Sequence, residues 1–318
     1  MFTAIILPIL LLVVGFVILV YGAIGLVDGA SSLAKRLSVS EIAIGLTIVA
    51  FGTSAPELVV NVFASFDGHA EIAFGNILGS NLFNILMVLG IAGVVKPIAV
   101  KRNTVRKEIP FMLMGTIFVF GLSNNFSLSG SILSFWDGVL LIMGLVVFQI
   151  YVLTIAKEQY LDVDIKLYSI PKSVMLLILG IAGLLIGGEM VVNNAVKIAK
   201  LLNMSENFIG LTLVALGTSL PELVTSVVAV VRGHSDIAIG NVVGSNIFNL
   251  FLVLGVSSMI HPLNYDPSLN PDFSFLIVVT FFLLLTMFTG KKHKIDRWEA
   301  IIFLILYGGY IYLILLRG

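Results

Sequence analysis

The chain has 318 residues, of which 58% are hydrophobic and only 11% are charged, and its mean hydropathy is +1.10. A soluble domain usually carries about 25% charged residues, so this composition predicts an integral membrane protein. The formal net charge is zero and there is no cysteine, which argues against nucleic-acid binding and excludes disulfides, thiol catalysis and thiolate metal sites.

Apolar runs of about 20 residues, the length that crosses a bilayer as a helix, recur ten times along the chain. The first run lacks the basic start and the cleavage site of a signal peptide, so we expect it to be a retained spanning helix. The predicted spans are 5–27, 40–66, 71–95, 108–123, 135–156, 172–194, 205–231, 236–260, 273–289 and 298–316. The predicted fold class is an all-α integral membrane protein with ten transmembrane helices.

Lys and Arg are distributed unevenly between the two sides that these spans define. Fifteen fall on one side, and only Lys197, Lys200 and Arg317 fall on the other. By the positive-inside rule the first side is cytoplasmic, so both termini are predicted to be extracellular. We expect a multi-pass protein of the cell membrane whose central linker is cytoplasmic.

The two halves of the chain repeat each other. Residues 45–90 align without a gap on residues 210–255, and 28 of the 46 positions are identical. Each half holds five spans, and an odd number makes the halves enter the membrane from opposite sides. Such inverted repeats are typical of secondary transporters, whose substrates bind near the membrane midplane. We predict a first repeat at 1–156, a short cytoplasmic linker at 157–171 and a second repeat at 172–318; duplication kept only for packing is the alternative.

A polar cluster containing a proline interrupts the second span and recurs in the seventh. The first copy reads GTSAPE (52–57) and the second reads GTSLPE (217–222). Pro56 has no N–H to donate, so Gly52 and Pro56 are expected to bend the helix and to leave carbonyls near Ala50 and Phe51 free.

The two clusters end in Glu57 and Glu222. An ionisable group near the bilayer centre is costly, which favours a functional role for both glutamates.

A second polar motif reads GNILGSNLFN (75–84) and recurs as GNVVGSNIFN (240–249). Its glycines are spaced for close helix packing. Asn76 and Asn241 are predicted to form hydrogen bonds between helices, whereas Asn81 and Asn246 directly follow serines and are expected to face elsewhere. Ser80 and Asn84 are four residues apart and would share one helix face, as would their repeats.

Together the two motifs offer carboxylate, hydroxyl, amide and carbonyl oxygens. Calcium takes six to eight oxygen ligands and sodium also prefers oxygen, so the set suits a hard cation. No soft ligand is present, and zinc or copper ligation is poorly supported.

The paired motifs closely resemble the alpha-repeats of the cation/calcium exchanger superfamily, and within it the prokaryotic sodium/calcium exchanger type. The resemblance implies that Glu57 and Glu222 flank calcium and that the carbonyls of Ala50 and Ala215 serve sodium. The oxygen ligands that it further implies are Thr53, Ser54, Ser80, Thr218, Ser219 and Ser245, with Asn84 and Asn249 at the last motif positions. Some relatives, including potassium-dependent exchangers, carry an aspartate at the position of Asn249, so potassium coupling is disfavoured.

The resemblance implies a secondary active antiporter that exchanges sodium for calcium by alternating access. Its partners would be the transported Na⁺ and Ca²⁺ ions and the lipid bilayer, with no cofactor and no nucleic acid; a monomer is compatible with the pattern. The alternatives are a proton-coupled calcium or cation antiporter and a passive cation channel. An enzyme is disfavoured, because the sequence has no phosphate-binding loop, no HExxH motif and no plausible nucleophile with its base.

Overall fold

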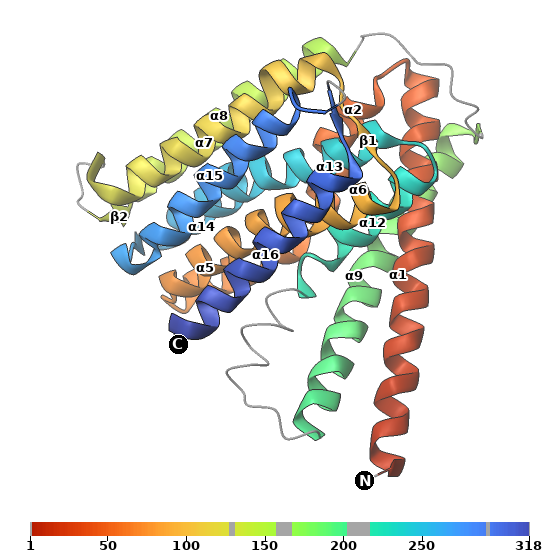
Figure 1. Cartoon of the computed structure of the whole chain (residues 1–318), viewed down its shortest axis with the longest axis horizontal. Coiled ribbons are helices and arrows are strands. Elements are labelled where there is room, and N and C mark those ends of the chain that lie inside the picture. Colours follow the sequence, from red (N-terminus) through yellow and green to blue (C-terminus); the bar gives the residue numbers. More distant parts are fainter. Residues whose placement is uncertain (1, 127–130, 157–166, 202–216, 291–292, 318) are drawn as a thin grey trace.

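The computed structural model describes residues 2–126, 131–156, 167–201, 217–290 and 293–317, which form a bundle of helices with four two-residue strands (Figure 1). The helices and strands are α1 (Phe2–Leu37), α2 (Glu41–Ile44), η1 (Gly45–Val49), α3 (Ala50–Thr53), α4 (Ala55–Phe66), α5 (Ala70–Leu82), η2 (Phe83–Val88), α6 (Leu89–Val95), β1 (Ile98–Ala99), η3 (Thr104–Glu108), α7 (Ile109–Gly121), η4 (Leu122–Phe126), β2 (Ile132–Leu133), α8 (Phe135–Ile155), α9 (Ile170–Leu201), α12 (Leu220–Val231), α13 (Ser235–Phe248), η6 (Asn249–Val253), α14 (Leu254–Ile260), β3 (Leu263–Asn264), η7 (Pro267–Leu269), α15 (Asn270–Thr286), β4 (Lys294–Ile295) and α16 (Arg297–Arg317).

Seven of the described helices are long and apolar enough to cross a membrane, and the bent pair made by α2 to α4 is an eighth candidate. α7 has only 13 residues, but π-helical turns extend it at both ends, so residues 102–126 form one helical run. α12 is a shorter apolar helix, and residues 205–216 of the predicted seventh span lie outside the described part of the chain. The prediction of an all-helical, multi-pass membrane fold is confirmed.

Two helices are longer than the spans predicted for them. α1 continues to Leu37, and α9 runs from Ile170 to Leu201, so the predicted bounds 5–27 and 172–194 are too short. Hydropathy marks only the stretch that lipid must cover, whereas a helix continues into polar residues as long as its backbone hydrogen bonds do.

α1 and α9 lie side by side and extend beyond the rest of the bundle (Figure 1). Small residues bring their backbones into contact. A Cβ added at Gly22 would lie 2.8 Å from the backbone nitrogen of Leu184, and one at Gly187 would lie 2.7 Å from that of Leu19. Larger residues at these two positions would force the helices apart.

The centre of the bundle is built from α5–α6 and α13–α14. In these two spans 78% and 94% of the most apolar window is buried, compared with 28% in α1 and α16. The second polar motif lies on these central helices in both repeats, and its Ser80, Asn84, Ser245 and Asn249 side chains are buried in protein. Their positions make the centre the place to look for a functional site.

The glycines of the second motif make close packing possible, as predicted. A Cβ at Gly240 would lie 3.0 Å from the Cα of Gly45, and one at Gly244 would lie 2.6 Å from the Cβ of Ala50. Around Gly75 and Gly79 no described residue lies within 4 Å of such an atom. The packing role is therefore confirmed for Gly240 and Gly244.

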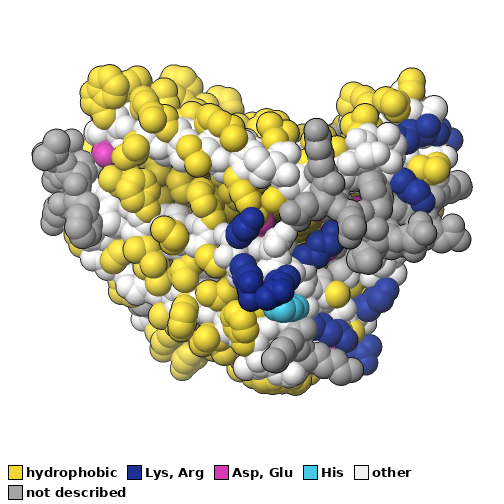
Figure 2. Space-filling model, turned by 90° about the horizontal axis from the view of Figure 1, so that it is seen from above, with side chains coloured by type: hydrophobic (Ala, Val, Ile, Leu, Met, Phe, Trp, Pro, Cys, Tyr) yellow, Lys and Arg dark blue, Asp and Glu magenta, His cyan; other side chains and the backbone are white. Residues whose placement is uncertain are grey.

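Two antiparallel strand pairs join the connecting segments. β1 pairs with β4 through Ile98 and Ile295, and β2 pairs with β3 through Leu133 and Leu263. The labels of β1 and β2 in Figure 1 stand at opposite ends of the bundle. Basic side chains gather on the face seen from above in Figure 2. The last turn of α1 is also basic, with Lys35 and Arg36.

Candidate functional site

The proline of the first motif bends the second span at the predicted place. α3 ends at Thr53, Ser54 leaves helical geometry with φ −81° and ψ 5°, and α4 starts at Ala55 with an axis turned by 47°. Ser219 has nearly the same conformation, with φ −93° and ψ 6°, immediately before α12. Both motifs therefore start a new helix at the same point of the repeat.

Each new helix carries its glutamate in the first turn. Glu57 follows Pro56 in α4, and Glu222 follows Pro221 in α12. The first turn of a helix presents N–H groups and the positive end of the helix dipole, which favour a carboxylate there.

The prediction that the bend frees the carbonyl of Ala50 is wrong. This carbonyl accepts the N–H of Ser54 at 3.0 Å, because the last turn of α3 closes its own backbone bond before the proline. The hydroxyls of Thr53 and Ser245 also lie 3.2 and 3.4 Å from it. The Ala50 oxygen is nevertheless part of the polar cluster at the centre.

Glu57 and Glu222 are both completely buried. Oε1 of Glu57 accepts hydrogen bonds from Ser219 at 3.0 Å and from Ser80 at 3.3 Å. Oε1 of Glu222 accepts from Ser54 and Ser245, both at 3.3 Å. Each carboxylate is thus bound by one serine of its own half and one serine of the other half.

The second oxygen of each glutamate has no such partner. Oε2 of Glu57 and Oε2 of Glu222 are buried without a hydrogen bond from any described residue, and so are Oδ1 of Asn84 and Oδ1 of Asn249. Within the described ranges no Lys, Arg or His forms an ion pair with either glutamate. A buried carboxylate without a counter-charge is costly, so these four acceptor oxygens suit a cation that arrives from outside.

Most of the predicted site residues are brought together. Thr53 Oγ1 lies 3.3 Å from Ser245 Oγ, and Ser80 Oγ lies 3.1 Å from Ser219 Oγ, so hydroxyls of the two halves are in contact. Asn84 and Asn249 lie in the π-helical segments η2 and η6. Such π-helical turns often mark functional positions.

Two of the predicted ligands have a different status. Thr218 is partly buried, and its hydroxyl forms no hydrogen bond with any described residue. Ala215 lies outside the described residues.

Asn76 and Asn241 form hydrogen bonds between helices, as predicted. Asn76 donates to Oδ1 of Asn61 at 2.7 Å, and Asn241 donates to Ser226 at 3.0 Å while accepting from Thr53 at 2.9 Å. Asn61 and Ser226 were missed as members of this polar centre. Their signal in the sequence is their position, four residues after each glutamate and equivalent in the two repeats.

Asn81 and Asn246 form hydrogen bonds with each other across the two halves. The side-chain nitrogen of each donates to the backbone oxygen of the other at 3.4 Å. They also accept hydrogen bonds from Asn249 and Asn84, respectively, both at 3.0 Å. The sequence predicts only that these two residues face elsewhere than Ser80 and Ser245.

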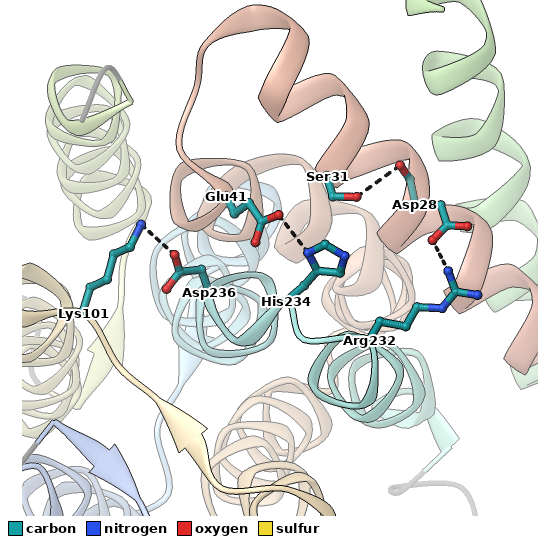
Figure 3. A network of polar contacts seen from close by, with 7 residues as sticks. All are labelled: Asp28, Ser31, Glu41, Lys101, Arg232, His234 and Asp236. Atoms are coloured by element: carbon teal, nitrogen blue, oxygen red, sulfur yellow. Dashed lines mark hydrogen bonds and ion pairs between the residues drawn. The ribbon is translucent and has the colours of Figure 1, made fainter. Parts of the chain in front are cut away.

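A second polar cluster lies where α1 ends and α13 begins (Figure 3). Its charged residues, which we call the charged end, are Asp28, Glu41, Lys101, Arg232, His234 and Asp236. Lys101 pairs with Asp236 at 2.7 Å, His234 contacts Glu41 at 2.8 Å, and Arg232 pairs with Asp28. Here every carboxylate drawn has a basic partner, in contrast to the glutamates at the centre.

Comparisons with known proteins agree with this geometry. The model of the family "Sodium/calcium exchanger protein" matches residues 7–154 and 172–316. Sodium/calcium exchanger MaX1 of Methanosarcina acetivorans is 30% identical in an alignment 335 positions long, which covers 94% of this chain and 95% of that protein. The uncharacterized membrane protein MJ0091 of Methanocaldococcus jannaschii is 38% identical over 281 residues, covering 86% and 87% of the two chains.

A solved structure has the same fold. It is that of the sodium-calcium exchanger NCX_Mj soaked with 2.5 mM Na⁺ and 0.1 mM Ca²⁺, and it matches with a TM-score of 0.83 at 33% identity over 98% of both chains. The match in fold, over nearly the whole of both chains, agrees with the match to the family model. The chain belongs to the sodium/calcium exchanger protein family.

Proposed function

We propose that this protein is a secondary active antiporter that exchanges sodium for calcium across the membrane by alternating access. The observation that carries this proposal is the pair of buried glutamates, each with one carboxylate oxygen that no described residue binds. Two ionised carboxylates offset the charge of one calcium ion. Family membership and the oxygen-rich surroundings support calcium and sodium as the transported substrates.

The proposed ligands are the residues that the motifs predict. Glu57 and Glu222 flank calcium, and neutral oxygens complete the cage and hold sodium when calcium has left. These oxygens come from Ala50, Thr53, Ser54, Ser80, Asn84, Ala215, Thr218, Ser219, Ser245 and Asn249. Hydrogen bonds that link six of these groups to one another or to the glutamates support the assignment of Ala50, Thr53, Ser54, Ser80, Ser219 and Ser245.

Exchange follows from shared ligands. Calcium and sodium need the same carboxylate and hydroxyl oxygens, so one load excludes the other. An empty site would have to pass two uncompensated carboxylates through an apolar barrier, whereas a loaded site is close to neutral. Only the ion-loaded protein therefore switches readily the side of the membrane to which its site is open. As a result, calcium crosses in one direction only when sodium crosses in the other.

The proposed architecture is ten transmembrane helices in two inverted repeats, 1–156 and 172–318, joined by the linker 157–171. The reciprocal bonds of Ser54 with Glu222 and of Ser219 with Glu57 support it, since a two-fold relation exchanges them. The strand pairs also support it. β1 and β3 occupy equivalent places in the repeats, yet each pairs with a strand of the other half.

We further propose that the end that carries the basic residues is cytoplasmic and that both termini are extracellular. α1 and α9 are proposed to slide against the core to change access. Their long, glycine-lined contact is compatible with sliding, and this step rests on analogy of fold.

The test is calcium uptake into proteoliposomes loaded with sodium and diluted into medium without sodium. Uptake of radiolabelled calcium is expected with an outward sodium gradient and not with equal sodium on both sides, at a fixed pH on both sides. Uptake driven equally well by a proton gradient would favour the proton-coupled antiporter. Calcium flux that needs no counter-ion would favour a passive channel and overturn the proposal.

A further inference from the structure

Four asparagines are linked by hydrogen bonds that all run between the two halves. They are Asn81 and Asn84 of the first motif and Asn246 and Asn249 of the second, and each is at most 1% exposed. Only Asn84 and Asn249 belong to the proposed ligand set. The role of Asn81 and Asn246 follows from the direction of the bonds.

The orientation of the amides of Asn81 and Asn246 is fixed by backbone atoms. Each side-chain nitrogen faces the main-chain oxygen of the other residue at 3.4 Å. A main-chain oxygen can only accept, so the group that faces it must be the NH₂ end of the amide. Turning either amide over would bring two oxygens together.

The fixed amides of Asn81 and Asn246 in turn fix the orientation of the Asn84 and Asn249 amides. With their nitrogens engaged, Asn81 and Asn246 present Oδ1 on the other side, where it accepts from the NH₂ groups of Asn249 and Asn84, both at 3.0 Å. The oxygens of Asn84 and Asn249 are therefore turned away from this set of bonds. They are the buried Oδ1 atoms that no described residue binds.

These two oxygens belong to the same helix face as the serines that bind the glutamates. Asn84 follows Ser80 by four residues, and Asn249 follows Ser245 by four, which places each pair on one side of its helix. Ser80 binds Glu57, and Ser245 binds Glu222. The fixed amides thus direct oxygen, and not NH₂, toward the proposed ion site.

We infer that Asn81 and Asn246 are positioning residues that hold the ligand amides of Asn249 and Asn84 with their oxygens toward the ion. The inference rests on the proposed function. Each half orients a ligand of the other half, because Asn81 holds Asn249 and Asn246 holds Asn84. The interaction between an ion and an amide dipole scales with the charge of the ion, so orientation favours Ca²⁺ over Na⁺.

The primary test is the variant Asn81→Leu, which removes the acceptor for Asn249 with little change in volume. Partners that orient a ligand typically change metal affinity by roughly 10- to 100-fold, and we expect a loss of calcium affinity in this range. The loss of sodium affinity should be smaller. Equilibrium binding of radiolabelled calcium to the purified full chain gives the first value, and competition by sodium gives the second.

A double-mutant cycle separates positioning from a purely structural role. An aspartate at position 249 presents an oxygen in either orientation and needs no holding. In the Asn249→Asp background, residue 249 has no NH₂ group to donate to Oδ1 of Asn81, so Asn81→Leu should not lower calcium affinity. Equal losses in both backgrounds would overturn the inference, because a structural role does not depend on the chemistry of residue 249.

Controls keep the result interpretable. Asn124→Leu breaks another bond between asparagines, at 2.6 Å to Asn270 and outside both motifs, and should leave calcium affinity unchanged. If Asn81→Leu does not fold, the symmetry-related cycle of Asn246→Leu with Asn84→Asp carries the same expectation. Wild-type protein that binds no calcium would refute the proposed function. If the wild-type protein binds calcium and both Asn81→Leu and Asn246→Leu bind it with wild-type affinity, only the positioning role is refuted.

Discussion

At the charged end Asp28, Glu41 and Asp236 each lie against a basic side chain, whereas at the centre Glu57 and Glu222 accept side-chain hydrogen bonds from serines. The two places also differ in burial. Side chains of the charged end keep between 9% and 38% of their surface exposed, whereas both central glutamates keep none. Among the described residues, the fold places a basic side chain beside each partly exposed carboxylate of the charged end and places none beside the two fully buried glutamates.

We propose that this difference separates structural carboxylates from functional ones. Partly exposed ion pairs contribute about 0–1 kcal/mol each and join neighbouring helices. A buried carboxylate with only hydroxyl partners is destabilising until a cation binds, so it makes binding favourable and keeps the empty site from crossing the barrier. A lysine or arginine at the centre would remove the need for calcium.

The largest expected effect comes from neutralising the central glutamates. Unit charges 4 Å apart at an effective dielectric constant of 20 interact by about 4 kcal/mol, so Glu57→Gln or Glu222→Gln should reduce sodium-driven calcium uptake at least about 100-fold. Glu41→Gln is the matched control, since it removes a carboxylate of the charged end and should leave uptake within about twofold of wild type. Normal uptake by either central variant would show that the site is elsewhere.

The second expectation concerns the stability of the whole protein. Calcium at about 100 times its Kd should stabilise the folded protein by about 2.7 kcal/mol, because it binds the native state only. Thermal unfolding in detergent, with and without calcium, measures this as a rise of the apparent melting temperature. The double variant Glu57→Gln/Glu222→Gln should lose the rise and should be at least as stable as wild type without calcium, since two uncompensated charges are gone.

How much of this arrangement the sequence predicts depends on the kind of signal. The spans follow from hydropathy, and the bend at Ser54 follows from Pro56, because both are local properties of the chain. The repeat places Glu57 and Glu222 at equivalent positions, so the burial of both in the structure agrees with the sequence. Hydropathy, the proline and the repeat are all visible in the sequence, and together they predict the spans, the bend and the two candidate glutamates.

Contacts between the halves could not be predicted in the same way. Nothing in spacing along one helix shows that Ser219 binds Glu57 or that Asn81 holds Asn249. The first bond joins the start of α12 to α4 and the second joins η6 to α5, so both depend on how helices of the two halves pack, which is a tertiary property. For the same reason the ion pair of Asp28 with Arg232, 204 residues apart, has no signal in the sequence.

A smaller effect is expected from the serines that bridge the halves. Ser54→Ala and Ser219→Ala each remove one hydrogen bond to a glutamate of the other half. A hydrogen bond to a charged group is worth about 1.5 kcal/mol or more, so calcium affinity should fall about tenfold, to a similar extent in both variants. Ser65→Ala is the control, because this hydroxyl bonds the carbonyl of Asn61 on its own helix at 2.7 Å. Strongly unequal losses would contradict the two-fold equivalence of the halves.

The smallest effect is expected at the charged end. Asp28→Asn or Arg232→Gln breaks an ion pair whose side chains are 20% and 38% exposed, so each should lower stability by about 0.2–1 kcal/mol. The charge swap Asp28→Arg/Arg232→Asp should recover part of this loss, and 1 M salt should reduce the difference between all four proteins, because it shortens the screening length to about 3 Å. Thermal unfolding at low and high salt measures both effects. If Asp28→Asn or Arg232→Gln lost as much calcium uptake as Glu57→Gln, the distinction between the two kinds of carboxylate would be contradicted. A carboxylate with a basic partner within the protein would then be as necessary for transport as a buried carboxylate without one.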